Sequence, residues 1–458
     1  MSAEGLQQAR AKMVDAGVNE AAIGVFEHYY EQLAGGETGL IPEDSIEPLL
    51  DPPMLADVEI SEQQAREAIG KTVIIKLNGG LGTSMGMSKA KSLLPVRDGK
   101  NFLDLLVDQV RATRERYGAR LPLLFMNSFN TRDDTLAALA KHPDLPVGDL
   151  PLDFLQSQEP KLLADDLTPA TWPADPRLEW CPPGHGDLYP SLLSTGVLQQ
   201  LVDEGFRYAC VSNTDNLGAA PDAVLAGWFA QSGAPYAAEV CRRTAMDRKG
   251  GHLALRKSDG QLILRDTAQT ADEEMDYFTD EHRHPFFHTN NLWFDLPAVL
   301  AVLKERGGVL GLPLIRNTKT VDPKDSQSPQ VIQIESAMGA AIEVFEGAQA
   351  ICVPRRRFLP VKTTSELLLL RSDAYDVGDD GQLTLAVESA PTIELSTAYK
   401  KIGDFEDRFP AGPPSLRAAR SLSVDGDWTF GADVVVTGAA SLSAEGGTVQ
   451  DGATLGQS

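Results

Sequence analysis

Along the chain, short apolar runs alternate with segments in which apolar residues recur every three or four positions. The runs TVIIKL (72–77), LPLLFM (121–126) and YACVS (208–212) have the length and composition typical of buried strands. Helical spacing follows the first two runs, at 102–118 and 133–142. Such alternation predicts an α/β fold with a mixed, mostly parallel sheet and helices on both of its faces.

The alternation of predicted strands and helices continues through the middle of the chain, and the residues that follow the strands indicate where a ligand binds. In open α/β sheets, ligands bind outside the carboxyl ends of the strands. A glycine-rich segment follows strand 72–77, and Asn213-Thr214-Asp215 follows strand 208–212, so we expect the site at this edge. Thr131 is a plausible cap for the helix at 133–142. Further elements are expected as helices at 191–205 and 222–233 and as strands at 236–242, 252–257 and 261–266.

The chain is long enough for more than one folded unit. We expect a helical arm over residues 1–70 that packs on the core, a central domain over 71–388 and a C-terminal domain over 389–458. In the last of these, helical spacing at 400–409 gives way to short β-branched runs punctuated by Gly and Asp, which indicates coils of a β-solenoid. One helix face of the arm carries apolar residues at helical spacing, namely Ile23, Phe26, Tyr30 and Leu33.

Charge and composition narrow the range of partners. The net charge is −24 and the pI about 4.7, which disfavours binding to nucleic acid or anionic membranes. No apolar stretch approaches the ~20 residues that span a bilayer, and the N-terminus lacks the apolar core of a secretory signal. We therefore expect a cytoplasmic protein. The cysteines show no paired spacing, so neither zinc nor a disulfide framework is indicated, and we expect buried thiols at 181, 210, 241 and 352.

The segment KLNGGLGTSMGMSKAKS (76–92) predicts a phosphate cradle. Glycines let backbone N–H groups approach an anion, and the trailing lysines add positive charge. The Walker pattern is excluded because Ala90, not glycine, precedes Lys91-Ser92, and the Rossmann pattern is excluded because Met85 stands at the third glycine position. The alternative is a glycine-rich turn that binds nothing.

Several blocks of sequence, in one order, resemble the eukaryotic-type UTP–glucose-1-phosphate uridylyltransferases, also called UDP-glucose pyrophosphorylases. The resemblance implies a Rossmann-like, GT-A-like nucleotidyltransferase core in 71–388 and a short left-handed β-helix in 389–458. Because the tail ends early, it also implies a monomer or small homo-oligomer. The blocks are LNGGLGTSMGMSKAKS (77–92), FMNSFNTRDDT (125–135), PPGHGDLY (182–189), VSNTDNLGA (211–219), HTNNLW (288–293) and RRRFLPVKTTSELLLL (355–370).

The activity that this resemblance implies is the reversible, Mg²⁺-dependent formation of UDP-glucose and pyrophosphate from UTP and glucose 1-phosphate. In-line attack of one anion on another needs charge neutralisation and alignment rather than a protein nucleophile. By resemblance, Lys91 meets the triphosphate, Lys362 lies near the α-phosphate and the incoming sugar phosphate, and Asp215 is the metal ligand. Lys89 is displaced from the family's pattern by one position. A solvated surface lysine and a turn carboxylate are the alternatives for Lys362 and Asp215.

The resemblance also assigns binding residues. Gln156 takes the place of the family's uracil-reading glutamine, with Gln158 as the fallback because the surrounding block is only partly kept. For Glu335 an ordinary helix-start carboxylate is the alternative. The nucleotide-binding set is Leu77, Asn78, Gly79, Gly80, Met126, Gln156 and Gly186, and the sugar- and phosphate-binding set is His185, Asn213, Gly250, Gly251, Asn290 and Glu335.

Two other functions stay open at this point. One is a uridylyltransferase with broader or different sugar specificity, such as galactose 1-phosphate or an N-acetylhexosamine 1-phosphate. The N-acetylhexosamine relatives carry a more basic glycine loop, so the form LNGGLGTSMG disfavours them. The other is a catalytically silent scaffold whose tail recruits partners, which the presence of Lys91, Asp215 and Lys362 together disfavours.

Overall fold

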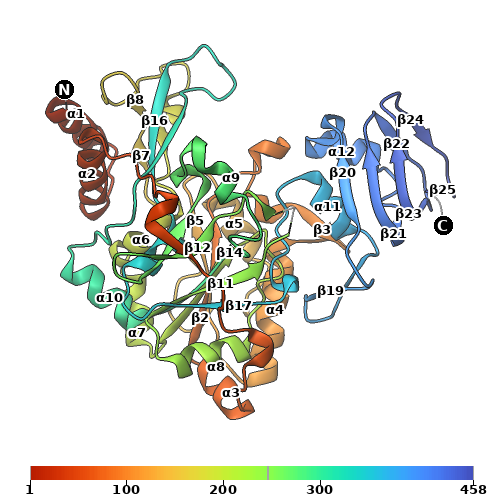
Figure 1. Ribbon diagram of the computed structural model, residues 1–458, viewed down its shortest axis with the longest axis horizontal. Helices are drawn as coiled ribbons and strands as arrows, with labels where there is room; N and C mark the ends of the chain where they lie inside the picture. The colour runs from red at the N-terminus through yellow and green to blue at the C-terminus, as the bar shows by residue number, and fades with distance from the viewer. Residues whose placement is uncertain (1, 245–246, 457–458) are drawn as a thin grey trace.

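The computed structural model describes residues 2–244 and 247–456, with the N-terminal helices at one end, a large sheet in the middle and the C-terminal strands at the other end (Figure 1). Within the described residues, no helix is both long and apolar enough to cross a membrane. All four cysteines are buried and free, which confirms the expected buried thiols.

The central sheet has seven strands in the order β17-β11-β14-β10-β2-β5-β6. Strand β14 runs antiparallel to both of its neighbours, and every other neighbouring pair is parallel. The predicted mixed, mostly parallel sheet is therefore confirmed. The strands are β2 (Thr72–Asn78), β5 (Leu123–Asn127), β6 (Asp153–Leu155), β10 (Tyr208–Asn213), β11 (Tyr236–Arg242), β14 (Phe286–Asp295) and β17 (Gln349–Cys352).

Successive side chains of a strand point to opposite faces of the sheet. Strand β2 therefore contributes side chains to two hydrophobic cores. Ile74 belongs to a core with α3, α4 and α8, whereas Val73 and Ile75 belong to a second core with α2, α6, α7 and α10. Helices thus cover both faces, as predicted. Their bounds are α2 (Glu20–Ala34), α3 (Glu62–Ile69), α4 (Phe102–Tyr117), α5 (Arg132–Leu139), α6 (Leu188–Ser194), α7 (Val197–Asp203), α8 (Ala223–Ser232) and α10 (Leu296–Glu305).

Two local predictions need correction. The single helix expected over 191–205 is two helices, α6 and α7, which are separated at Gly196 with φ +77°. A left-handed residue interrupts a right-handed helix, and glycine adopts this conformation without steric cost. Thr131 does stand at the N-cap position of α5, but its side chain makes no capping bond. Its hydroxyl accepts the N–H of Ser128 at 3.0 Å instead.

The N-terminal arm is helical only in part. Helices α1 (Ser2–Asp15) and α2 form a pair, and the four apolar residues predicted to face the core from α2 are all buried. Helices do not continue through 35–61, where prolines at 42, 48, 52 and 53 lack the N–H that a helix needs. That segment instead contributes β1 (Ile46–Pro48), which pairs with β12 (His252–Arg256) and through it with β13 (Leu262–Arg265). Helix α3 then packs on α8.

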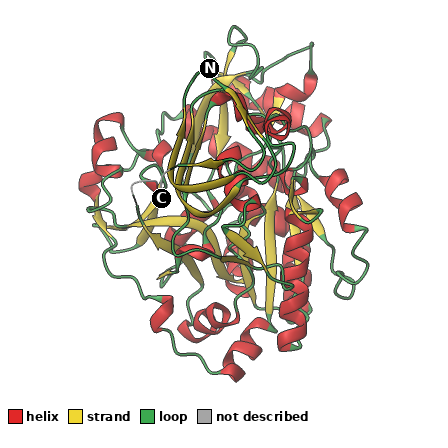
Figure 2. Cartoon of the chain, turned by 90° about the vertical axis from the view of Figure 1, so that its right-hand side faces the viewer, coloured by secondary structure: helices red, strands yellow, loops and turns green. Residues whose placement is uncertain are grey.

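The C-terminal strands stack side by side and run parallel, as Figure 2 shows. Parallel strands that follow one another in sequence are typical of solenoid coils. The left-handed sense of the coil and the domain boundaries at 70/71 and 388/389 stay predictions. The elements are β20 (Thr392–Leu395), α12 (Ile402–Arg408), β21 (Ser415–Val424), β22 (Trp428–Phe430), β23 (Val435–Leu442), β24 (Gly447–Val449) and β25 (Thr454–Leu455).

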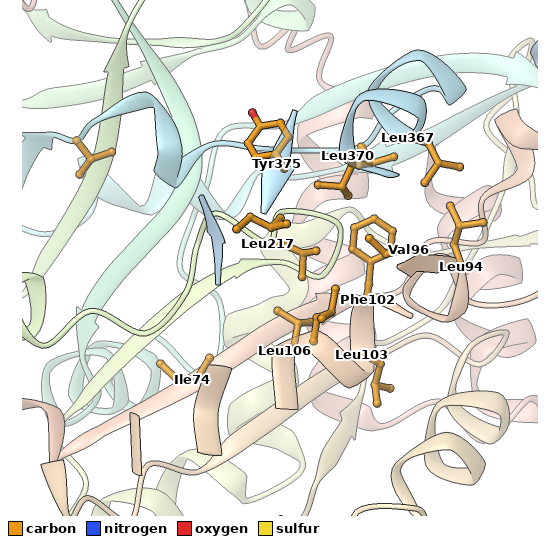
Figure 3. Close-up of a cluster of buried hydrophobic side chains, with 14 of the residues drawn as sticks. Ile74, Leu94, Val96, Phe102, Leu103, Leu106, Leu217, Leu367, Leu370 and Tyr375 are labelled. Atoms are coloured by element: carbon orange, nitrogen blue, oxygen red, sulfur yellow. The ribbon is translucent and has the colours of Figure 1, made fainter. Parts of the chain in front are cut away.

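A continuous hydrophobic cluster joins the sheet to the C-terminal part of the chain. Figure 3 shows Phe102 of α4 close to Leu367 and Leu370 of α11 (Thr364–Arg371), and the same cluster contains Leu217. Helix α11 is thereby held against the core, with its first turn close to the strand ends. Smaller elements are β3 (Pro95–Arg97), β4 (Lys100–Asn101), β7 (Glu159–Pro160), β8 (Leu162–Leu163), β9 (Trp180–Cys181), α9 (Met275–Phe278), β15 (Ile315–Thr320), β16 (Gln330–Glu335), β18 (Tyr375–Val377) and β19 (Leu383–Leu385).

Candidate active site

The glycine-rich loop leaves the carboxyl end of β2 and returns to it. Leu81 and Ala90 form an antiparallel bridge, and the N–H of Lys91 donates to the carbonyl of Gly80 at 3.2 Å. A Cβ at Gly82 would lie 2.6 Å from the sulfur of Met87, so a larger residue there would have to displace the Met87 side chain. This folding carries Lys91 back to the strand end.

Lys91 meets Asp215 at this edge. Its ammonium donates to Oδ2 of the carboxylate at 2.6 Å, and the two side chains are only 18% and 15% exposed. The other carboxylate oxygen, Oδ1, is buried and has no hydrogen-bond partner among the described residues. A buried carboxylate oxygen without a partner is costly unless a further donor or cation occupies its vicinity. The pair therefore offers one cation and one free hard oxygen.

The turn that carries Asp215 is tied to two neighbouring segments. Thr214 donates to the carbonyl of Leu77 from both its N–H and its hydroxyl, at 3.2 and 3.1 Å. The carbonyl of Asp215 accepts the N–H of Val361 at 3.2 Å, which brings Lys362 beside the turn. Lys362 itself is exposed, and the next residue, Thr363, caps α11 with its side chain. Lys91 thus contacts Asp215 through its side chain, whereas Lys362 is brought to the same turn by its backbone.

Gln156 directly follows β6 and is held by two hydrogen bonds. Its N–H donates to the carbonyl of Asn127 at 2.8 Å, and its Nε2 donates to the carbonyl of Gly184 at 2.7 Å. A Cβ at Gly79 would lie 2.8 Å from Oε1 of Gln156, so the glycine leaves room for this side chain. Gln158 is also half-buried, but its side chain makes no hydrogen bond to another described residue. The geometry places Gln156 between the glycine loop and the loop at 182–187.

The loop at 182–187 presents His185 and Gly186. Gly186 donates its N–H to the carbonyl of Ser336 at 2.8 Å, and a Cβ at Gly186 would come within 2.2 Å of the Ser336 hydroxyl. Nδ1 of His185 accepts the N–H of Met338 at 2.9 Å, so the neutral ring carries its proton on Nε2. Burial lowers the pKa of His185 and keeps the ring neutral. His185 can therefore donate one hydrogen bond to an anionic or sugar oxygen.

Asn213 and Asn290 meet across β10 and β14, where Nδ2 of Asn290 donates to Oδ1 of Asn213 at 3.2 Å. Asn290 has φ +62°, next to a register shift between β11 and β14. Nδ1 of His288 accepts the N–H of Asn290 at 3.2 Å and so supports this unusual backbone. Burial lowers the pKa of His288 to about 3, which keeps its ring neutral as well.

Other predicted site residues are engaged in contacts within the protein. The side-chain amide of Asn78 is buried and donates to Asn127 and Thr135, both at 2.8 Å, so only its backbone is left for a ligand. Met126 is a core residue of β5, 2% exposed. The carbonyl of Gly251 accepts the N–H of His288 at 2.8 Å, which ties it to β14 two residues before Asn290.

Gly250 and Glu335 contact segments outside the central sheet. The carbonyl of Gly250 accepts a bond from Arg243 at 2.5 Å. Glu335 is the last residue of β16, so its reading as a helix-start carboxylate is wrong. It accepts a bond from Asn317 at 3.0 Å and lies beside Gly184.

Comparison with known proteins decides the family. The family model described as UTP–glucose-1-phosphate uridylyltransferase matches residues 23–437. This chain belongs to that family. It is 38% identical to the uridylyltransferase of Solanum tuberosum over 91% of this chain and 84% of that protein. It is 39% identical to that of Saccharomyces cerevisiae over 85% and 77%.

Solved structures of this uridylyltransferase family agree with the fold. A mutant UDP-glucose pyrophosphorylase from Leishmania major in complex with UDP-glucose matches with a TM-score of 0.92 and 44% identity, covering 100% of this chain and 99% of that chain. A protein from Trypanosoma brucei named UDP-glucose phosphorylase matches with a TM-score of 0.91 and 42% identity, covering 99% and 98%.

Sequence reasoning missed several buried charges under this uridylyltransferase site. Lys76 is 1% exposed, and its ammonium donates to the Ser212 hydroxyl at 2.7 Å and to the carbonyl of Ala219 at 2.9 Å. Burial lowers its pKa to about 8. Glu239 and Arg357 form a second buried set. The available signal was a charged residue inside an apolar run, TVIIKL for Lys76 and YAAEVCR for Glu239.

Proposed function

We propose that this chain transfers the uridylyl group of UTP to glucose 1-phosphate, giving UDP-glucose and pyrophosphate in a reversible reaction. The observation that carries the proposal is the meeting of Lys91, Asp215 and the segment of Lys362 at one edge of the sheet. Family membership supports the same activity, because the relatives bear this name.

In the proposed reaction, a phosphate oxygen of the sugar phosphate forms a bond to the α-phosphorus of UTP while the bond to the pyrophosphate oxygen breaks. Both partners are anions, so the barrier depends on charge neutralisation and alignment. Lys91 would hold the triphosphate, and Lys362 would reach the α-phosphate and the incoming phosphate. Backbone groups of Leu77, Gly79 and Gly80, with Gln156, would orient the uracil.

The sugar phosphate would lie on the other side of the same edge. Asn213 and Asn290 offer amide donors and acceptors for sugar hydroxyls, and Nε2 of His185 offers a donor for a phosphate oxygen. The imidazole is neutral, so it positions an oxygen without adding charge. Gly250, Gly251 and Glu335 are proposed to bound the sugar pocket.

Asp215 fits a Mg²⁺ ion. Its Oδ1 is buried without a partner, and Mg²⁺ prefers one or two carboxylates together with phosphates and water. Within 2–244 and 247–456, no group of three His, Cys, Asp or Glu side chains could enclose a metal, as is usual for an ion shared with substrate. When bound, the ion neutralises phosphate charge.

Finer features of the chain are part of the same proposal. We infer a left-handed coil for the C-terminal strands and a monomer or small homo-oligomer. The acidic net charge of −24 disfavours binding to nucleic acid or anionic membranes. A cytoplasmic location is part of the same proposal.

Pyrophosphate release from UTP tests the function, measured with glucose 1-phosphate, galactose 1-phosphate and N-acetylglucosamine 1-phosphate, each with and without Mg²⁺. We expect turnover with glucose 1-phosphate that requires Mg²⁺. Faster turnover with another sugar phosphate would replace the proposed substrate. Absence of turnover with all three would favour a scaffold and overturn the proposal.

A further inference from the structure

The side chain of Asn216 links the two segments that carry Asp215 and Lys362. Asn216 is 2% exposed, and its Oδ1 accepts the N–H of Leu359 at 2.8 Å. An antiparallel bridge joins Asn216 to Pro360, beside the backbone bond from Val361 to Asp215. These contacts form a short ladder between the turn after β10 and the segment that precedes Lys362.

The other end of the Asn216 amide is anchored in a buried polar network. Its Nδ2 donates to Oδ1 of Asn291 and to the carbonyl of Arg357, both at 3.2 Å. Arg357 donates to both carboxylate oxygens of Glu239, at 2.8 and 2.9 Å, and Asn291 donates to the same carboxylate at 3.1 Å. Glu239 is fully buried and also accepts a bond from Trp293 at 2.9 Å. Such a satisfied network has a single geometry, because losing one member leaves a buried group unpaired.

The next residue of the turn, Leu217, is held by hydrophobic packing. Leu217 is 1% exposed and lies in the hydrophobic cluster that also holds Leu367 and Leu370 of α11 (Figure 3). Its carbonyl accepts a bond from the amide of Gln109 at 3.0 Å. The turn is therefore fixed from the apolar side as well, and Asn216 is its polar connection to the segment before α11.

Only an amide of this size can make all three bonds. Asparagine offers one acceptor oxygen and a two-proton donor, whereas aspartate offers acceptors alone and leucine neither. Removing the amide would leave the N–H of the half-buried Leu359 without this partner, and the carbonyl of Arg357 would keep only the longer bond from Asn291, at 3.4 Å. Asn216 is therefore a buried side chain that must both donate and accept hydrogen bonds.

We propose that Asn216 is a positioning residue, which holds the segment of Lys362 in register with Asp215 for the transfer step. The inference rests on the proposed function. Lys362 is exposed and its ammonium makes no hydrogen bond or ion pair within the described residues, so the backbone ties of 359–361 are what place it beside Asp215. A displacement of about 1 Å at a reacting group costs on the order of 100-fold in rate.

The test compares Asn216→Ala, Lys362→Ala and the double variant in the full chain. We expect Asn216→Ala to lower kcat by about 10- to 100-fold, while the Kd for UTP, measured by calorimetry, stays within about twofold. Because Asn216 acts through Lys362, the double variant should be no slower than Lys362→Ala alone.

Asn101→Ala is the matched control for lost stability. Asn101 caps α4, where its side chain accepts the N–H of Asp104 at 2.9 Å, and it makes no hydrogen bond to the turn of Asp215 or to 359–362 within the described residues. We expect the control to lower the free energy of unfolding by about 1 kcal/mol without changing kcat. If Asn216→Ala does not fold, Asn216→Ser is measured in the same way.

Three results separate the outcomes. Rate losses that multiply in the double variant, or an unchanged kcat in Asn216→Ala, would overturn the positioning role while leaving the proposed function intact. If the unmodified chain shows no uridylyl transfer, the proposed function fails instead. In that case amide hydrogen exchange tests whether Asn216 holds the segment before α11. The backbone amides of 357–363 should exchange faster in Asn216→Ala than in the unmodified chain. An unchanged exchange rate would refute the positioning role of Asn216.

Discussion

The ammonium of Lys91 lies 2.6 Å from Oδ2 of Asp215, although 124 positions separate the two residues in the chain. Without substrate, each charge neutralises the other in a half-buried setting. In the proposed reaction, the triphosphate would supply a counter-charge to Lys91, and the metal ion would supply one to Asp215. The pair therefore places a cationic group and a carboxylate side by side for an anion and a cation to bind.

Asp215→Asn should uncouple the site from Mg²⁺. The amide keeps the shape of the side chain but loses the charge that attracts a divalent ion, so we expect kcat to fall by about 100- to 1000-fold. Initial rates over a Mg²⁺ titration measure the effect. Asp144→Asn removes a surface carboxylate that is paired with Arg111 and serves as the control. A variant whose rate still responds to Mg²⁺ as before would exclude Asp215 as the ligand.

Lys362→Ala should reduce turnover and spare the nucleotide. Lys362 is exposed, so its loss leaves the core intact, and we expect kcat to fall by about 100-fold or more with little change in UTP affinity. Steady-state kinetics and calorimetry separate the two effects. The control is Lys141→Ala, at another exposed lysine. Equal kcat values for Lys362→Ala and Lys141→Ala would show that Lys362 is a solvated surface lysine without a role in the transfer.

Gln156→Ala should weaken UTP binding by about tenfold, the cost of about 1.4 kcal/mol for lost polar contacts. Gln156 bridges Gly79 and Gly184, whereas Gln158 does not, so Gln158→Ala should bind UTP as the unmodified chain does. Calorimetric titration with UTP and with CTP measures both affinity and base preference. The reverse order of effects would assign the uracil to Gln158.

Lys76→Met should change how stability depends on pH. The pKa of Lys76 is lowered by burial from 10.5 to about 8. Below pH 8 both the folded and unfolded chains carry the proton, so the burial cost is constant. Between pH 8 and 10.5 only the unfolded chain retains it, and stability rises with pH by up to about 3 kcal/mol.

The Lys76→Met variant lacks this rise, so the unmodified chain should gain stability relative to it as the pH increases through that window. Urea unfolding at several pH values measures the difference. Lys71→Met, at an exposed lysine just before β2, controls for loss of an ammonium. A difference in unfolding free energy that stays constant from pH 8 to 10.5 would contradict the low pKa.

Features with a local cause were predictable from the sequence. The strands at 72–78 and 208–213 follow from runs of β-branched and aromatic residues, and α4 follows from its apolar spacing. The glycine loop was recognisable because close backbone packing excludes side chains. Family membership was likewise visible, since the motif blocks are contiguous in sequence.

Tertiary structure alone decided which groups meet. The bond from Lys91 to Asp215, the link from Asn216 to Leu359 and the burial of Lys76 depend on the order of strands in the sheet, which brings β2 and β10 together. Strand order is a long-range property that apolar periodicity does not encode. The side chain of Asn78 shows the consequence: its motif position suggested a ligand, but its neighbours β5 and α5 use its amide to hold the strand end.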